Sequence, residues 1–221
     1  PFDGQIQIRQ GPSQEIFVPQ NGWQDGEMGH GPTSAAPDPS ESSLAIQWPL
    51  PPDLPSPTAH RLRLAVMASG SGSNFEALVE ACRRDELAAD VVLLAVNNPG
   101  CGAQTRAERL GIPWMLHDHR AVSSRQELDL GLCRSFRDAE VDLVVMAGWM
   151  RIVTEELIDA FPERLINIHP SLLPSFRGGR AIADALEAGV TLSGCTAHLV
   201  SLEVDTGPIL VQAAVPVLPG D

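Results

Sequence analysis

The chain of 221 residues contains neither lysine nor tyrosine, and all 15 of its basic residues are arginine. A Schiff-base lysine, a tyrosine base and the lysine of a Walker-type phosphate loop are therefore excluded. Only four cysteines are present, and they are widely spaced without a CxxC pair, which argues against a zinc ribbon or a redox dithiol. We expect these thiols to be reduced, as in a cytosolic protein.

Long apolar runs and basic clusters are also missing from the sequence. No stretch approaches the ~20 apolar residues that a membrane helix requires. The formal net charge is −13 and the arginines form no stripe, which does not suit binding to the phosphates of nucleic acid. We therefore expect small-molecule substrates rather than nucleic acid or a membrane, and a cytoplasmic location. The sequence leaves open whether the protein is a monomer or a homodimer.

Proline is distributed unevenly and divides the chain into two parts. Residues 1–60 hold 11 of the 19 prolines and show no hydrophobic periodicity. Such a composition cannot bury enough apolar surface to offset the entropy of ordering. We predict a disordered, proline-rich tail over residues 1–60 and one folded domain over residues 61–221.

From Arg61 onward, short apolar runs alternate with segments of helical periodicity. The predicted strands are 62–68, 90–96, 114–116, 141–147 and 165–168, and the predicted helices are 74–84, 101–110, 123–139, 154–161 and 181–188. This alternation predicts an α/β fold with a Rossmann-like, doubly wound and mostly parallel sheet. Two further strands, 194–200 and 209–217, are joined by a short link, so we expect them to be antiparallel.

A turn rich in glycine and serine, SGSGSN at residues 69–74, joins the first strand to the first helix. Glycine lets the backbone approach a ligand closely, and the amides and dipole of a helix N-terminus attract an anion. The turn lacks the third glycine of the dinucleotide fingerprint, and Asn97 and Asn98 stand where an acid would follow the second strand. These features favour a monophosphate over NAD. A tight turn without a ligand is the alternative.

A second polar segment, NIHPSLLP at residues 167–174, begins at the carboxyl end of a predicted strand, where open α/β sheets bind ligands. Asn167 and His169 are two residues apart in an extended segment, so their side chains point the same way. An amide beside an imidazole can stabilise an oxyanion and move a proton. A structural histidine with satisfied hydrogen bonds is the alternative.

A third segment, LEVDTGP at residues 202–208, links the last two strands. Asp205 in this loop could reach a histidine across the end of the sheet and keep it protonated. Aspartate before Thr-Gly-Pro also suits a plain turn.

The sequence His117-Asp118-His119 has the spacing of a zinc-binding pair, but no third ligand is marked by spacing. We therefore predict no metal site.

Four motifs stand in a fixed order over about Leu62 to Asp221. They are SGxGSN at 69–74, AGWMRI at 147–152, NIHPSLLP at 167–174 and VDxGP at 204–208. Together they closely resemble the phosphoribosylglycinamide formyltransferases, folate-dependent enzymes of purine synthesis within the formyltransferase superfamily. The NIHPSLLP motif marks the superfamily, and the SGSGSN turn narrows the resemblance to this family.

The resemblance implies the formyltransferase fold and the way in which two ligands would be held. Gly72, Ser73 and Asn74 would hold the phosphate of the ribosylglycinamide. The loop at residues 201–205 would line the pterin pocket for 10-formyltetrahydrofolate, the formyl donor. The other residues that would bind this donor are Arg125, Met150, Arg151, Ile152, Val153 and Asn167.

The resemblance also implies the catalytic roles. His169 would be the catalytic acid, Asp205 the carboxylate that keeps it charged, and Asn167 a second donor to the tetrahedral oxyanion. The sequence RGGRAI at residues 177–182 departs from the family's usual pattern, and the family's C-terminal helix would lie beyond Asp221, so we expect residues 61–221 to lack it. Two alternatives stay open, namely a 10-formyltetrahydrofolate hydrolase and a truncated, non-catalytic module that binds phosphate or folate.

Overall fold

The computed structural model describes residues 61–218 and 220–221. The strands are β1 (Leu62–Ala68), β2 (Ala89–Val96), β3 (Trp114–Leu116), β4 (Leu143–Met146), β5 (Leu165–His169), β6 (Leu192–Leu199) and β7 (Ile209–Pro216). The helices are α1 (Ser73–Arg83), α2 (Gly102–Leu110), α3 (Arg125–Asp138), α4 (Glu155–Ala160) and α5 (Ala181–Glu187). Each element predicted after Arg61 is present, with ends within two residues of the prediction. The predicted tail at residues 1–60 lies outside the described residues.

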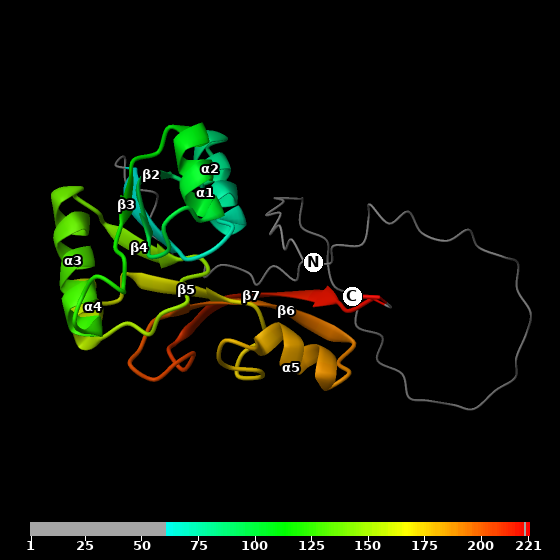
Figure 1. Ribbon diagram of the computed structural model, residues 1–221. Coiled ribbons are helices and arrows are strands. Elements are labelled where there is room, and N and C mark those ends of the chain that lie inside the picture. Colours follow the sequence, from blue (N-terminus) through cyan, green and yellow to red (C-terminus); the bar gives the residue numbers. More distant parts are fainter. Residues whose placement is uncertain (1–60, 219) are drawn as a thin grey trace, which may run out of the picture. The chain divides into compact units, whose positions relative to one another are not determined.

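The strands form one seven-stranded sheet in the order β3-β2-β1-β4-β5-β6-β7 (Figure 1). The strands from β1 to β5 are parallel, whereas β6 is antiparallel to both β5 and β7. The predicted α/β fold with antiparallel C-terminal strands is therefore confirmed. The strand order reverses between β1 and β4, and ligands of open α/β sheets bind at the carboxyl ends beside such a reversal.

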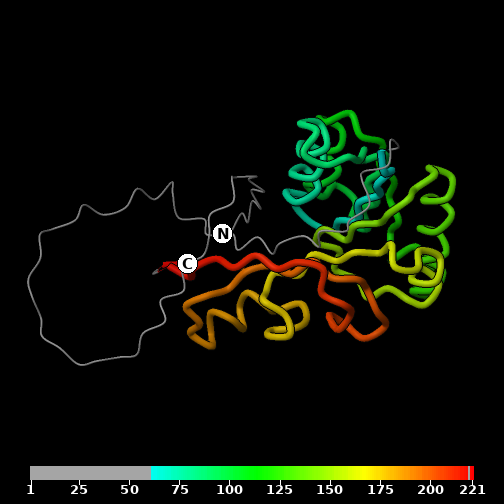
Figure 2. Tube along the Cα trace, turned by 180° about the vertical axis from the view of Figure 1, so that it is seen from behind, coloured from blue at the N-terminus to red at the C-terminus, as the bar shows by residue number. Residues whose placement is uncertain are grey.

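Two hydrophobic layers cover the two faces of the sheet. Along β1, Ala65 and Met67 point into the layer shared with α3 and α4, while Leu64, Val66 and Ala68 point into the layer beneath α1 and α2. This alternation has the two-residue period of a strand. Because β1 is buried on both faces, it reads as a continuous apolar run in the sequence. Figure 2 shows the backbone of the same strands and helices from behind.

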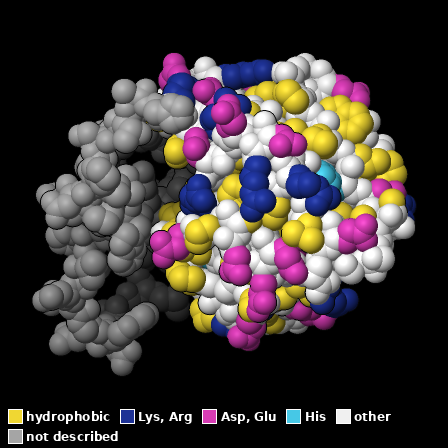
Figure 3. Space-filling model, turned by 90° about the vertical axis from the view of Figure 1, so that its left-hand side faces the viewer, with side chains coloured by type: hydrophobic (Ala, Val, Ile, Leu, Met, Phe, Trp, Pro, Cys, Tyr) yellow, Lys and Arg dark blue, Asp and Glu magenta, His cyan; other side chains and the backbone are white. Residues whose placement is uncertain are grey.

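Two expectations from composition concern thiols and the membrane. All four cysteines, which lie in the described part of the chain, are free thiols, as predicted. None of the helices described between residues 61 and 221 is long and apolar enough to cross a membrane. On the face shown in Figure 3, arginines, acidic side chains and apolar side chains are interspersed.

Candidate functional site

The glycine-serine turn leaves the carboxyl end of β1 and enters α1 at Gly72. Gly72 has a φ of 77°, and a Cβ atom placed there would lie 2.6 Å from the Cα atom of Ala103 on α2. Only glycine fits both the left-handed backbone and the close approach of the neighbouring helix. Ser73 and Asn74 begin α1, so their backbone amides have no partner within the helix and are available to an anion.

Arg106 on α2 braces this turn from outside, and the sequence analysis did not single it out. Its Nε donates to the carbonyl of Ser71 at 2.9 Å, and its guanidinium forms an ion pair with Glu76 in the first turn of α1. The backbone amide of Ala103 donates to the carbonyl of Gly70 at 3.0 Å. The turn is thus held against α2 at both Gly70 and Ser71.

The segment after β4, residues 148–153, is hydrogen-bonded to the same turn. The hydroxyl of Ser69 accepts from the amide of Met150 at 2.8 Å, and the amide of Ser69 donates to the carbonyl of Gly148 at 3.0 Å. Met150 is 65% exposed and Ile152 is 52% exposed, which leaves two large apolar side chains uncovered at the ligand-binding edge.

The remaining predicted donor-binding residues differ in their surroundings. Val153 is buried and belongs to the core layer of α3 and α4, so its side chain does not face a ligand. Arg125, at the first position of α3, and Arg151 line one cavity of about 230 Å³. The other residues that line it are His119, Val122, Ser123, Ser124 and Leu128. The structure therefore brings together both arginines predicted from the resemblance.

Asn167 and His169 lie around one carboxylate, that of Asp205. The Nδ1 atom of His169 is 3.3 Å from Oδ2 of Asp205, and the two side chains are only 6% and 7% exposed. The Nε2 atom of His169 lies 2.8 Å from the carbonyl oxygen of Phe176. Because a carbonyl oxygen only accepts, Nε2 carries a hydrogen, and a second hydrogen on Nδ1 would complete an ion pair with Asp205.

His198 on β6 joins this cluster, and the sequence analysis did not identify it. It stands opposite Asn167 in the antiparallel pairing of β5 and β6 and is buried. Its Nδ1 donates to the carbonyl of Leu199 at 2.9 Å, and its Nε2 accepts from Nδ2 of Asn167 at 3.1 Å. Nδ2 of Asn167 also lies 3.4 Å from Oδ1 of Asp205, so the amide nitrogen is directed toward both groups.

The position of Asp205 is set by the backbone of two loops. Asp205 itself has a φ of 55°, in the left-handed region, and its Oδ2 accepts from the amide of Gly178 at 2.8 Å. A Cβ atom at Gly207 would lie 1.8 Å from the carbonyl oxygen of Leu199, so this loop closes only with glycine. In the nearby RGGRAI sequence, which differs from the usual pattern of the resembled family, Arg180 forms ion pairs with Asp184 and Glu187.

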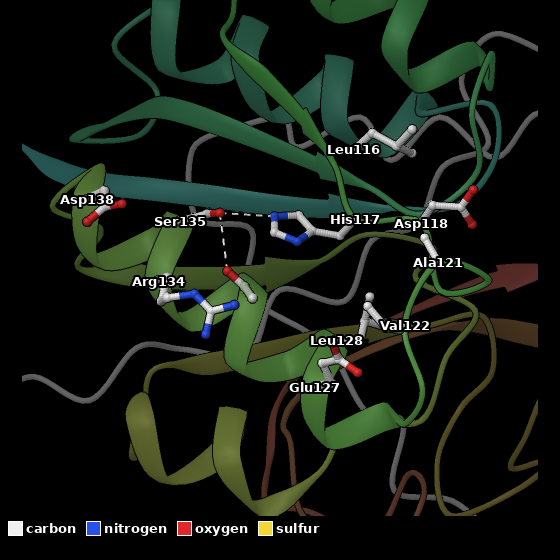
Figure 4. Close-up of a pocket in the computed structure, with 11 residues that line it drawn as sticks. Leu116, His117, Asp118, Ala121, Val122, Glu127, Leu128, Arg134, Ser135 and Asp138 are labelled. Carbon is white, nitrogen blue, oxygen red and sulfur yellow. Dashed lines mark hydrogen bonds between the residues drawn. The ribbon is translucent and has the colours of Figure 1, made fainter.

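The residues with zinc-like spacing have separate partners. Nε2 of His117 is 3.1 Å from the hydroxyl of Ser135, in a cavity of about 460 Å³ between the segment after β3 and helix α3 (Figure 4). Asp118 pairs with Arg120, which lowers the pKa of Asp118 to about 2. Nδ1 of His119 lies near the carbonyl of Asn97. Across residues 61–218 and 220–221, no three His, Cys, Asp or Glu side chains are grouped to hold a metal ion.

The fold and the site together define an α/β protein in which the carboxyl edge of the sheet carries a glycine-serine turn at a helix N-terminus and a histidine–aspartate pair. A family model described as formyl transferase matches residues 62–221. The chain belongs to this family, which confirms the resemblance found in the sequence.

Several named relatives are similar to this chain. The trifunctional purine biosynthetic protein adenosine-3 of Drosophila melanogaster is 47% identical over 163 residues, which are 73% of this chain but only 12% of that protein. The phosphoribosylglycinamide formyltransferase of Bacillus subtilis is 38% identical over 69% of this chain and 78% of its own length. The crystal structure of glycinamide ribonucleotide transformylase 1 from Symbiobacterium toebii superposes with a TM-score of 0.72 at 43% identity, covering 74% of this chain and 77% of that one.

Proposed function

We propose that this chain transfers the formyl group of 10-formyltetrahydrofolate to the amine of 5-phosphoribosylglycinamide, a step of purine synthesis. The observation that carries the proposal is the cluster of Asn167, His169 and Asp205 at the end of β5, in a chain of the formyl transferase family. The names of the relatives from Bacillus subtilis and Symbiobacterium toebii support the choice of acceptor.

The two ligands would approach the cluster along the carboxyl edge of the sheet. The phosphate of the acceptor would bind at Gly72, Ser73 and Asn74, where the amides of α1 are available. The exposed apolar side chains of Met150 and Ile152 would pack against the flat ring of the donor. Arg125 and Arg151, which line one cavity, would bind carboxylates at the other end of the donor.

In the reaction, the amine nitrogen of the acceptor forms a bond to the formyl carbon, and the bond from that carbon to N10 of the folate breaks. The formyl oxygen carries negative charge in the tetrahedral intermediate. Protonated His169 stabilises this charge by donating a hydrogen bond. The amide nitrogen of Asn167 would donate a second one in exchange for one of its contacts with His198 and Asp205. The hydrogen on Nε2 of His169 is accepted by the carbonyl of Phe176 in this structure, so the oxyanion would take the place of that carbonyl as its acceptor.

One proton must also move from the attacking amine to N10 as the intermediate collapses. His169 supplies a site for this transfer, and Asp205 stabilises the charged ring while it holds two hydrogens. None of the residues in this scheme forms a covalent intermediate with the formyl group. The chemistry therefore depends on hydrogen bonds and on the position of one histidine.

An assay of donor consumption tests the proposal. Loss of 10-formyltetrahydrofolate is followed with the full chain, with and without 5-phosphoribosylglycinamide. We expect loss only when the amine is present, together with one formylated amine for each donor consumed. Equal loss without the amine would indicate a hydrolase, and ligand binding without loss would indicate a non-catalytic module; either result overturns the proposal.

A further inference from the structure

A buried carboxylate outside the reacting cluster lies in helix α3. Asp129 is 1% exposed and sits among the core side chains of this helix, beside Leu128 and Leu132. Burying a carboxylate is unfavourable unless it is hydrogen-bonded. Its Oδ2 accepts two hydrogen bonds from Thr154, one from the backbone amide at 2.6 Å and one from the hydroxyl at 2.8 Å.

Thr154 directly follows the segment at residues 150–153 and is the N-cap residue of α4. The two bonds from Thr154 therefore fix the end of this segment. Its beginning is fixed by the bond from the amide of Met150 to the hydroxyl of Ser69. The segment is thus held at one end by the phosphate-binding turn and at the other by α3.

Arg125 stands four residues before Asp129 on α3, about one helical turn away. Arg125 and Arg151 line the same cavity, although they come from different elements. Arg151 lies in the segment before Thr154, and Arg125 lies on α3. The hydrogen bonds between Asp129 and Thr154 therefore join the segment of one arginine to the helix of the other. This tie helps to set the relative position of the two arginines, together with the packing of Val153 in the core layer of α3 and α4.

We propose that Asp129 is a positioning residue for the formyl donor: by holding Thr154, it sets residues 150–153 against α3 so that Arg125 and Arg151 face one ligand. This inference rests on the proposed function, because it takes the cavity between the two arginines as part of the donor site. In this scheme Asp129 contacts neither ligand, and it belongs neither to the acceptor site nor to the cluster of Asn167, His169 and Asp205.

Both hydrogen bonds end on one oxygen of Asp129, so the amide oxygen of asparagine can accept both of them. Burial raises the pKa of the Asp129 carboxyl, and the hydrogen bonds from Thr154 lower it in part. A neutral asparagine avoids the cost of burying a charge, so Asp129→Asn is expected to fold. Asp129→Ala removes both bonds while changing no residue of the ligand sites.

The experiment compares full-length variants in steady-state transfer and in direct titration with 10-formyltetrahydrofolate. For Asp129→Ala we expect the donor KM and Kd to rise about tenfold, as two lost hydrogen bonds allow, with the acceptor KM within about twofold of the parent. Asp129→Asn should restore the donor KM to nearly that of the parent. Asp138→Ala, an exposed acid at the end of the same helix, is the matched control and should change neither value.

Thr154→Val provides a second route if Asp129→Ala does not fold. It removes only the hydroxyl donor and should raise the donor KM by a smaller factor, whereas Thr154→Ser should not. Equal rises in both KM values, a fall in melting temperature with an unchanged donor KM, or the same defect in Asp129→Asn would overturn the inference. If the proposed function is wrong, the parent chain transfers no formyl group, which none of these outcomes includes. The titration would still compare the binding of 10-formyltetrahydrofolate among the variants.

Discussion

At the scale of single residues, the site depends on one carboxylate that contacts several partners. Asp205 receives the amide of Gly178, faces Nδ1 of His169 and lies near the side chains of Asn167 and His198. Since its side chain is nearly buried, these contacts replace water as its hydrogen-bonding environment. The carboxylate therefore orders the histidine and the asparagine.

Asp205→Asn tests this dependence. An amide has a similar shape but carries no charge to stabilise a doubly protonated His169, so we expect kcat to fall by about 100-fold or more. The donor KM should change less than kcat, because Asp205 is one of several residues that would line the donor site. Steady-state kinetics measure both values, and Asp159→Asn, an exposed acid on α4, serves as the control. A kcat like that of the parent would contradict the role given to Asp205.

Some of these residues could be predicted from the sequence, and others could not. Asn167 and His169 follow from local rules, because a strand end and the alternation of side chains place them at one edge. For Asp205 the residues left a plain turn open, and the resemblance implied its contact with the histidine. His198 required the register of β5 against β6, which local pattern does not fix. Asp129 left a signal, a charged residue on the apolar stripe of α3, but its partner Thr154 is 25 residues away and could not be named.

At the scale of elements, the conformation of the glycine-serine turn, the proposed phosphate site, is set by its neighbour α2. Gly72 combines a left-handed backbone with a close contact to Ala103, whereas Gly70 in the same turn has open space around its Cα atom. The two glycines thus differ in what a methyl group would meet. An alanine at Gly70 therefore serves as a control for an alanine at Gly72, because only the second one would disturb the conformation of the turn.

Gly72→Ala should lower both stability and affinity for the acceptor. The left-handed backbone alone costs about 1–2 kcal/mol for alanine, and the contact with α2 adds to this cost. Thermal unfolding should show a fall in melting temperature of roughly 2–4 °C per kcal/mol for a chain of this size, and kinetics should show a raised acceptor KM. Gly70→Ala should change the melting temperature much less; equal shifts in the two variants would contradict the account of the turn.

At the scale of the whole molecule, the order of strands and helices was predictable because the central strands are buried on both faces and read as unbroken apolar runs. The predicted tail at residues 1–60 stays a prediction.

The stability of the folded domain depends on pH, and one histidine outside the proposed ligand sites contributes to this dependence. Burial, with a smaller effect of Arg134, lowers the pKa of His117 below its usual value.

This shift has a definite sign. The unfolded chain binds a proton at His117 more readily than the folded chain does, so the free energy of unfolding falls as the pH drops below about 6.5. His117→Gln should remove this contribution and lose less stability between about pH 7.5 and about pH 5.5. Urea unfolding of both chains at the two pH values measures the difference. The same loss in both chains would contradict the assignment to His117.

The central claim is that His169 directs the formyl group of the donor to a phosphoribosyl amine. The most direct measurement follows an isotopically labelled formyl carbon by NMR, from 10-formyltetrahydrofolate into product, in the parent chain and in His169→Gln. The account predicts label in the N-formyl group of the phosphoribosyl product, and a rate about 100- to 1000-fold lower in the variant. Label recovered as free formate, or a parent-like rate in His169→Gln, would contradict it.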